Sequence, residues 1–271
     1  MATTPLDGDD SDRDGGERDR VSDRPMTTGA PIAAAAVGFD LGETLYHYAA
    51  PPFSWIEASR PWLDSLLIAL GIDRSKSDIA QAHRRHESYS AYLRERIERR
   101  DATDVMTDAL GRLGGARAAQ AERAVDTVFG VLRRSLVAYP DAVETLAALK
   151  QAGFVVGALT NVPFCLPRRT IHHDLRHTGL APYIDGFVSS VDVGLRKPHR
   201  ATFEWLAATL GVALEELVYI GNLPTDVTGA KACGCISVFL DRTRNGMDYG
   251  QAATIHHLRE LPALVTLARR S

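Results

Sequence analysis

Polar side chains of the kind used in group-transfer chemistry follow apolar runs at several points in the sequence. They are Asp40, Thr160 with Asn161, Lys197, and Asn222 with Asp226. In an open parallel sheet, ligands bind beyond the carboxyl ends of the strands, so residues in these positions are expected to share one crevice. A carboxylate, a hydroxyl, a lysine and a second carboxylate around one crevice suit phosphoryl transfer.

Each of these side chains has a possible role in such a reaction. The Asp40 carboxylate could attack phosphorus and form an aspartyl phosphate. The Thr160 hydroxyl could donate a hydrogen bond to a phosphoryl oxygen, and Lys197 could neutralise charge on nucleophile and phosphate together. Asp226 could bind Mg²⁺, a hard cation that takes carboxylate oxygens together with phosphate. The sequence has neither G-x-x-x-x-G-K-[ST] nor G-x-G-x-x-G, so a P-loop nucleotidase or a Rossmann dehydrogenase is not indicated.

The elements that must position these residues alternate between strands and helices from residue 32 onward. Apolar runs that end in polar turns predict strands at 33–41, 154–161, 186–194, 216–222 and 235–241. Helical patterns lie between them, at 140–153, 201–211 and 226–234. Apolar strands joined by crossover helices indicate a parallel sheet that is covered on both faces. The predicted fold is therefore an α/β domain with a doubly wound parallel sheet.

The α/β pattern is interrupted once, and a separate tail precedes it. Residues 53–137 show no strand signal and contain amphipathic helical patterns, which predicts an all-helical insertion. The sheet domain then comprises residues 32–52 and 138–271. Residues 1–31 contain seven Asp, one Glu and four Arg but almost no large apolar side chain, so a disordered tail is expected.

Composition indicates which partners and which cellular compartment to expect. A net charge of −3 gives no electrostatic footprint for nucleic acid or for an acidic membrane surface, and neither partner is expected. Three cysteines are too few for a disulfide framework, which favours a reducing compartment. No apolar run approaches the length of about 20 residues that spans a bilayer. A cytoplasmic protein is expected, and the sequence does not set its oligomeric state.

Four short segments carry a resemblance to a known family: F-D-L-G-E-T-L (39–45), ALTN (158–161), G-L-R-K-P-H (194–199) and IGNLPTDVTGAKACG (220–234). In this order they are similar to the four motifs of the haloacid-dehalogenase (HAD) superfamily of hydrolases. Those motifs are D-x-D-x-T after a strand, a Ser or Thr ending a strand, a Lys before Pro, and an acidic pair before a helix. The resemblance implies a Rossmann-like core. The insertion resembles the helical cap of the first subclass, which closes over the crevice and sets substrate choice.

The resemblance also implies an activity and a set of site residues. It implies a Mg²⁺-dependent phosphatase of a small phosphorylated metabolite, with Asp40 as the nucleophile. Thr160 and Asn161 would orient the phosphoryl group, and Lys197 would balance charge. The implied metal ligands are Asp40, the backbone carbonyl of Gly42, Asn222 and Asp226.

Two positions depart from the phosphatase pattern. Gly42 stands where the phosphatases carry a second Asp, which protonates the leaving group and later activates water, a role worth roughly 10²–10⁴-fold. Asn222 stands where the fourth motif usually has Asp, and an amide keeps an oxygen ligand but removes one negative charge. Tyr46 and His47, which lead toward the predicted cap, are candidates to replace the missing acid, although packing or solvent-facing roles are favoured for both.

Two alternatives stay open beside the phosphatase. A pseudoenzyme, kept as a binding module, would follow from the loss of the acid and of one metal ligand. A metal-independent hydrolase like the haloacid dehalogenases would use Asp40 to displace halide from carbon. Those dehalogenases also lack the second Asp but carry an aromatic residue in its place, which Gly42 does not supply.

Overall fold

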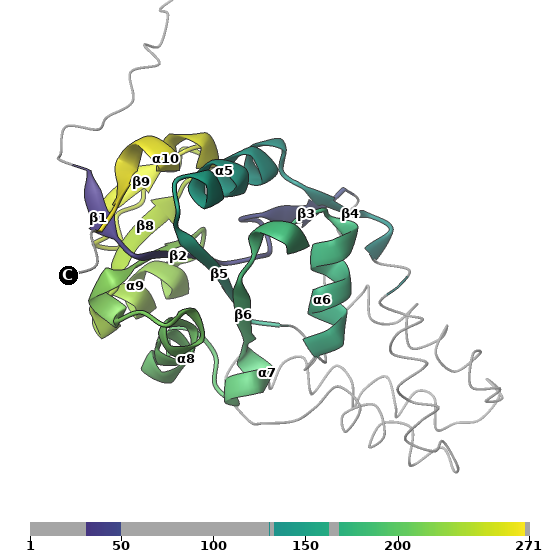
Figure 1. Ribbon diagram of the computed structural model, residues 1–271, viewed down its shortest axis with the longest axis horizontal. Coiled ribbons are helices and arrows are strands. Elements are labelled where there is room, and N and C mark those ends of the chain that lie inside the picture. The colour runs from purple at the N-terminus through teal and green to yellow at the C-terminus, as the bar shows by residue number, and fades with distance from the viewer. Residues whose placement is uncertain (1–30, 50–129, 131–132, 163–167, 269–271) are drawn as a thin grey trace, which may run out of the picture.

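The computed structural model describes residues 31–49, 130, 133–162 and 168–268 of the 271-residue chain. At its centre is a six-stranded sheet in which every neighbouring pair of strands is parallel (Figure 1). In spatial order the strands are β6 (Gly186–Ser189), β5 (Val155–Thr160), β2 (Ala36–Phe39), β7 (Leu217–Gly221), β8 (Ile236–Leu240) and β9 (Ala253–Ile255). The parallel α/β sheet predicted from the sequence is confirmed.

Helices cover both faces of this sheet. On one face, α8 (Arg200–Leu210) packs against β5 and β6, and α9 (Pro224–Cys233) packs against β7 and β8. On the other face lies α5 (Pro140–Gln151), and each face has its own buried apolar cluster. The remaining helices are α6 (Arg168–His177), α7 (Ser190–Val193) and α10 (Leu261–Leu264), with short 3₁₀ turns at Ala181–Tyr183, Leu214–Glu216 and Leu258–Glu260.

Three glycines allow α8 to approach the sheet closely. Gly38, Gly157 and Gly186 are register partners in β2, β5 and β6. A Cβ atom at Gly157 would lie 2.7 Å from the Leu210 side chain, and one at Gly38 would lie 2.8 Å from the Leu206 side chain. Any larger residue in this row would push the helix away, which explains glycine inside three strands. This close packing of α8 holds in place the strands at whose ends the site residues lie.

The predicted strand at 33–41 consists of two strands with different partners. β1 (Ile32–Ala34) pairs in parallel with β10 (Val265–Leu267) in a separate two-stranded sheet, and only β2 belongs to the central sheet. The break falls at Ala35, whose N–H donates to the carbonyl of Glu216. Residues 33–36 are all alanine, so no side-chain pattern marks the change of partner.

The predicted strand at 186–194 is also shorter than expected, because β6 ends at Ser189 and α7 follows at once. The Ser189 hydroxyl accepts from the Asp192 N–H at 3.3 Å, and the Asp192 carboxylate accepts from the Ser189 N–H at 2.8 Å. This reciprocal capping box satisfies donors at the start of the helix. Gly194, with a φ of 74°, ends it. The S-x-x-D pattern at 189–192 is the sequence signal for the start of this helix.

The chain enters and leaves the predicted insertion through a short antiparallel pair, β3 (Tyr46–Tyr48) and β4 (Leu136–Ala138). The expected boundary after residue 137 therefore falls inside β4. Just before β4, Arg133 forms an ion pair of 2.6 Å with Asp174 of α6. The helical patterns at 53–137 lie almost wholly outside the described residues, as does the tail at 1–31, so both remain predictions.

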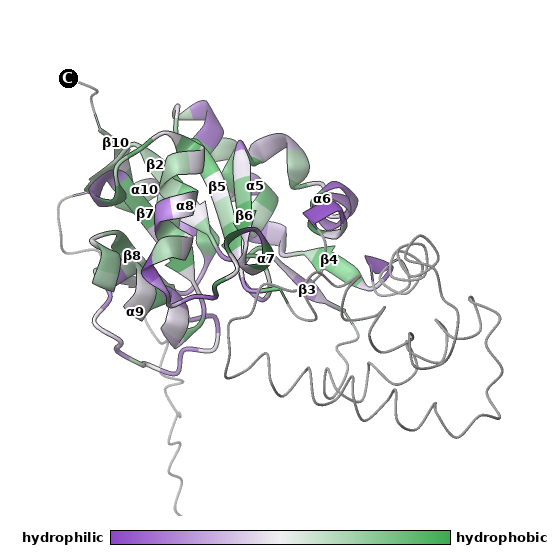
Figure 2. Cartoon of the chain, turned by 90° about the horizontal axis from the view of Figure 1, so that it is seen from below, coloured by the Kyte–Doolittle hydropathy of each residue, from purple (hydrophilic) through white to green (hydrophobic). Residues whose placement is uncertain are grey.

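The strands of the sheet are more hydrophobic than helix α6 at the surface. Figure 2 shows mainly hydrophobic strands at the centre and a hydrophilic α6 at the surface. The exposed residues of α6 include His172, His173 and His177. Within the described ranges, no helix is both long enough and apolar enough to cross a membrane.

Candidate active site

Three of the predicted site residues lie at the carboxyl ends of adjacent strands. Asp40 follows β2 directly, Thr160 is the last residue of β5, and Asn222 follows β7. The Asp40 N–H donates to the Ile220 carbonyl at 2.8 Å, which continues the hydrogen-bond ladder between β2 and β7. Because β2 lies between β5 and β7, these three positions share one edge of the sheet.

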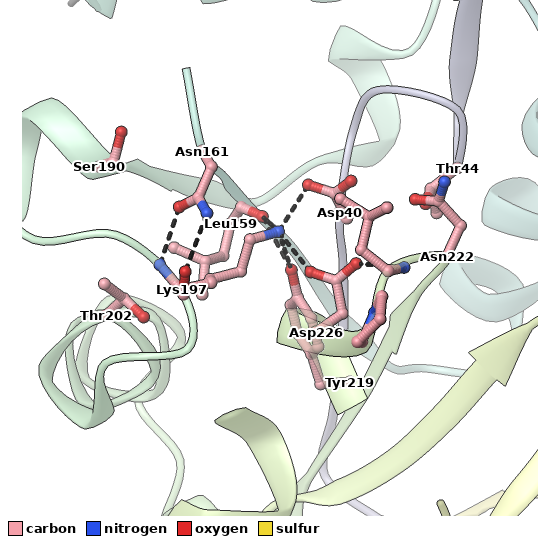
Figure 3. A network of polar contacts seen from close by, with 12 residues as sticks. Asp40, Thr44, Leu159, Asn161, Ser190, Lys197, Thr202, Tyr219, Asn222 and Asp226 are labelled. Atoms are coloured by element: carbon pink, nitrogen blue, oxygen red, sulfur yellow. Dashed lines mark hydrogen bonds and ion pairs between the residues drawn. The ribbon is translucent and has the colours of Figure 1, made fainter. Parts of the chain in front are cut away.

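The ammonium group of Lys197 lies among four oxygen atoms at this edge (Figure 3). Its Nζ atom is 2.6 Å from Asp40 Oδ1 and 2.7 Å from Asp226 Oδ1. It also lies 3.0 Å from the Leu159 carbonyl oxygen and 2.9 Å from the Tyr219 hydroxyl. Only 2% of the Lys197 side chain is exposed, so these oxygens replace its hydration. The structure thus brings together the predicted lysine and both predicted carboxylates.

Asp226 is held from two sides and is fully buried. Its Oδ2 atom accepts from the Leu223 N–H at 3.0 Å at the start of α9, while Oδ1 faces Lys197. A Cβ atom at Gly221 would lie 2.3 Å from the Asp226 carboxyl group, so only glycine at the end of β7 leaves room for it. Both carboxylate oxygens therefore face protein donors, and the role of Asp226 as a metal ligand remains a prediction.

Asn161 forms two hydrogen bonds with the backbone of Lys197, and its expected part in orienting the phosphoryl group remains a prediction. Its Nδ2 atom donates to the Lys197 carbonyl at 3.1 Å, and its Oδ1 atom accepts from the Lys197 N–H at 2.8 Å. The amide thus pairs with the backbone of residue 197 in both directions, much as a neighbouring strand would. In this arrangement, Asn161 positions the segment that carries Lys197, and its amide groups are already engaged by protein atoms.

Gly42 lies within the loop that follows Asp40, and Asn222, which follows β7, contacts this loop. The Thr44 hydroxyl donates to Asn222 Oδ1 at 3.1 Å, which joins this loop to the end of β7. Apart from its two chain neighbours, no atom of the described residues lies within 4 Å of a Cβ atom built at Gly42. In the described part of the chain, the position at which the HAD phosphatases carry their second Asp is therefore open at the Cβ atom.

Thr160 occupies the remaining predicted position. It is the end residue of β5 and pairs with Ser189 in the register of β5 and β6. Its side chain makes no hydrogen bond within the described part of the chain. A threonine hydroxyl in this place is available to a ligand at the strand end.

Among the residues that the structure describes, the charges at the site do not balance. Burial raises the pKa of the Asp40 carboxyl group to about 6; the charge of Lys197 opposes this shift and that of Asp226 adds to it. Burial alone would lower the pKa of the Lys197 ammonium, but the charges of Asp226 and Asp40 raise it above its ordinary value. One ammonium group thus serves two buried carboxylates, which leaves a deficit of positive charge.

The donors available for a metal are oxygens of the kind Mg²⁺ prefers: the Asp40 carboxylate, the Asn222 amide oxygen and backbone carbonyls near Gly42. Together with the deficit of positive charge, this chemistry fits a divalent cation. No three His, Cys, Asp or Glu side chains in the described ranges come together as a metal site. A cation here would therefore depend on the Asp40 carboxylate together with an amide, backbone carbonyls and substrate oxygens.

Tyr219 is a member of this site that the sequence reasoning missed. Its hydroxyl donates to the Leu159 carbonyl at 2.8 Å and lies 2.9 Å from Lys197 Nζ, and its ring packs edge-on against Phe203 at 5.1 Å. Burial raises the pKa of Tyr219 well above its ordinary value, so the hydroxyl stays protonated. A tyrosine in the middle of a fully buried strand was the available signal, because a buried hydroxyl needs a partner.

The two candidate replacements for the missing acid lie in β3. Tyr46 is buried in the apolar core, and burial raises the pKa of its hydroxyl well above the ordinary value. The His47 ring lies 4.6 Å from the ring of Tyr139. Both residues thus have packing roles, as the sequence reasoning favoured.

With this geometry in place, comparison with known proteins shows the family. A model of the haloacid dehalogenase-like hydrolases matches residues 34–234, which include Asp40, Lys197 and Asp226. The chain belongs to this family, and it is a hydrolase.

Particular relatives are phosphoglycolate phosphatases. The one from Salmonella typhimurium (strain LT2) is 32% identical over 133 residues, which are 48% of this chain and 49% of the relative. The one from Escherichia coli (strain K12) is 32% identical over 116 residues, which are 42% of each chain. The chain thus spans about half the length of the curated relatives it matches.

Solved structures share the fold at lower identity. A HAD phosphatase from Thermococcus onnurineus has a TM-score of 0.57 at 24% identity and covers 87% of this chain and 99% of its own. A 2-haloacid dehalogenase from Pseudomonas syringae pv. tomato DC3000 has a TM-score of 0.58 at 24% identity and covers 86% of this chain and 97% of its own. The same fold therefore serves both named chemistries, and the fold alone does not separate them.

Removal of one hydroxyl tests how the Lys197 site is held. We expect Tyr219→Phe to lower the free energy of unfolding by about 1–2 kcal/mol, because the Lys197 ammonium and the Leu159 carbonyl each lose a buried partner. Urea denaturation measures the change, with Tyr183→Phe as the matched control. A Tyr219→Phe protein as stable as the Tyr183→Phe protein would contradict the assigned role.

Proposed function

We propose that the protein is a Mg²⁺-dependent phosphatase of a small phosphorylated metabolite and acts through an aspartyl phosphate on Asp40. The observation that carries the proposal is the buried Lys197 ammonium, 2.6 Å from Asp40 and 2.7 Å from Asp226 at the carboxyl edge of the sheet. A carboxylate in this position can attack phosphorus, while the fixed ammonium stabilises the negative charge that collects on the entering and transferring oxygens.

In the first half of the reaction, a carboxylate oxygen of Asp40 forms a bond to phosphorus. The ester oxygen of the substrate leaves with the electron pair of the broken P–O bond. Thr160 donates a hydrogen bond to a phosphoryl oxygen, and Lys197 remains fixed between the two carboxylates. In the second half, water attacks the phosphorus of the aspartyl phosphate, which releases inorganic phosphate and restores Asp40.

Mg²⁺ would be held by Asp40, the backbone carbonyl of Gly42 and Asn222, with Asp226 contributing its charge. The bound cation would offset the negative charge of the phosphoryl group and help to orient it. The deficit of positive charge around Lys197 and the oxygen-only donor set support this part of the proposal. Asn222 in place of Asp removes one negative charge, so weaker binding of the cation is expected than in a site with an acid there.

Gly42 shapes the substrate preference that we expect. No acid at this position can protonate the leaving group, so substrates with good leaving groups, such as aryl or acyl phosphates, should react faster than alkyl phosphates. The names of the curated relatives make phosphoglycolate the first alkyl phosphate to compare. The cytoplasmic setting expected from the composition agrees with a metabolic substrate.

The decisive assay is hydrolysis of p-nitrophenyl phosphate and acetyl phosphate with Mg²⁺ and with EDTA. We expect turnover that requires Mg²⁺ and falls on the order of 10³-fold or more in Asp40→Asn, because the nucleophile is lost while the side-chain shape is kept. Absence of turnover in a folded wild-type protein would overturn the proposal in favour of a binding module. Turnover of a haloacid in EDTA would overturn it in favour of dehalogenase chemistry.

A second substitution restores the absent acid. We expect Gly42→Asp to raise kcat for phosphoglycolate by on the order of 10²-fold and to change acetyl phosphate turnover much less, because only the poor leaving group needs a proton. Among the described residues other than its chain neighbours, a Cβ atom at this position meets nothing within 4 Å, so the added side chain starts in open space.

Gly42→Asn is the matched control for this prediction, since it has the same size but no transferable acid proton. Equal rates for the Asp and Asn variants on phosphoglycolate would show that the missing acid does not limit the reaction. Steady-state kinetics of the three proteins on both substrates decide between these results.

A further inference from the structure

The loop that carries Asp40 is contacted from outside the site by a charged side chain that follows β8. Arg242 lies two residues beyond β8, and its two terminal nitrogens each donate to the Asp141 carboxylate at 3.0 Å. The guanidinium carbon lies 3.8 Å from the centre of the Tyr139 ring. Asp141 also accepts from the Leu258 N–H at 2.9 Å, so the pair is anchored to a third segment.

One of the Arg242 nitrogens reaches the catalytic loop itself. Nη2 donates to the backbone carbonyl of Thr44 at 3.0 Å, and the hydroxyl of the same Thr44 donates to Asn222 at 3.1 Å. A continuous chain of contacts therefore runs from Asp141 through Arg242 and Thr44 to Asn222. Arg242 touches neither Asp40 nor Lys197, so any effect on the reaction passes through the loop.

A second contact from the same cluster acts on the neighbouring residue of the loop. The Tyr139 hydroxyl donates to Glu43 Oε2 at 2.8 Å. Glu43 has a φ of 57°, in the left-handed region that residues with a Cβ atom seldom adopt. Such a conformation persists where the surroundings hold it. Here the Glu43 N–H donates to the Tyr46 carbonyl at 2.8 Å, and Tyr139, stacked under Arg242, contacts the Glu43 side chain.

Within the loop, local bonds set the shape of the turn. The N–H groups of Thr44, Leu45 and Tyr46 all donate to the one carbonyl of Leu41, at 3.3, 2.8 and 3.2 Å. From outside the turn, the Tyr139 N–H donates to the Leu45 carbonyl at 3.0 Å, and Arg242 donates to the neighbouring Thr44 carbonyl. Arg242 and Tyr139, which stack on each other, thus hold two successive carbonyls of the turn.

We propose that Arg242 is a positioning residue for the phosphoryl-transfer site, acting through the Thr44 carbonyl to hold the Asp40–Tyr46 loop against Asn222. The inference rests on the proposed function for its kinetic consequence and on the contacts alone for its structural one. A displacement of reacting groups by about 1 Å can cost on the order of 10²-fold in rate, so loss of the contact that holds the Thr44 carbonyl should lower kcat.

The experiment compares Arg242→Lys with Arg259→Lys, which changes an exposed arginine in the same way. Lysine keeps the charge but cannot hold Asp141 with two nitrogens and reach Thr44 together. Hydrogen exchange of the peptide that spans residues 40–46 should become faster in Arg242→Lys and stay at the wild-type rate in Arg259→Lys. With p-nitrophenyl phosphate, kcat should fall about tenfold in Arg242→Lys while KM stays within about twofold.

A double-mutant cycle with Thr44→Val identifies the route of the effect. If Arg242 acts through Thr44, the double variant should lose less kcat than the product of the two single losses. Independent losses would overturn the proposed route. Should Arg242→Lys not fold, Asp141→Asn weakens the same bidentate pair and takes its place in both measurements.

The two proposals fail in distinguishable ways. Unchanged exchange at residues 40–46 in Arg242→Lys would overturn the positioning role whatever the activity. A wild-type protein that hydrolyses no phosphate ester would overturn the phosphatase, while faster exchange in the same variant would still support Arg242 as the residue that holds the loop.

Discussion

The burial of one ammonium group between two carboxylates governs the arrangement of this protein. An isolated lysine could not be buried at the edge of the sheet in its charged form, because the loss of hydration costs several kcal/mol. Lys197 is accommodated because Asp40 and Asp226 contact it at 2.6 and 2.7 Å and two neutral oxygens complete its surroundings. The two carboxylates outnumber the ammonium group, and this excess of negative charge supports the proposal that a cation binds here.

The rest of the fold can be understood as support for that contact. Parallel strands place Asp40 and Asp226 near one edge, glycine at residue 221 leaves room for the Asp226 carboxylate, and Asn161 holds the backbone on which Lys197 stands. The loop after Asp40 is contacted separately, by Arg242 at the Thr44 carbonyl and by the Tyr139 N–H at the Leu45 carbonyl. The geometry of the site therefore depends on several segments, distant in sequence, that meet at one edge of the sheet. A rigid scaffold that presents functional residues on its loops is expected to work in this way.

The strands and the residues at their ends could be predicted from sequence, because buried parallel strands are apolar runs that stop at polar residues. Asp40, Lys197 and Asp226 were found in this way, and the structure places them in contact. The division of 33–41 into β1 and β2 could not be predicted. The four alanines at 33–36 give no side-chain pattern that marks where the chain changes its partner strand. The roles of Asn161, Tyr219 and Arg242 depend on contacts across 22 to 198 positions of the chain, and no local pattern encodes such contacts.

The most direct test of the account is chemical trapping of the phosphorylated residue. The protein is mixed with acetyl phosphate and Mg²⁺, quenched, and reduced with borohydride, which converts an aspartyl phosphate to homoserine that peptide mass spectrometry can locate. The account predicts homoserine at position 40 and none in the Asp40→Asn protein. Phosphate released during turnover without any modification at position 40, or modification at another residue, would contradict it.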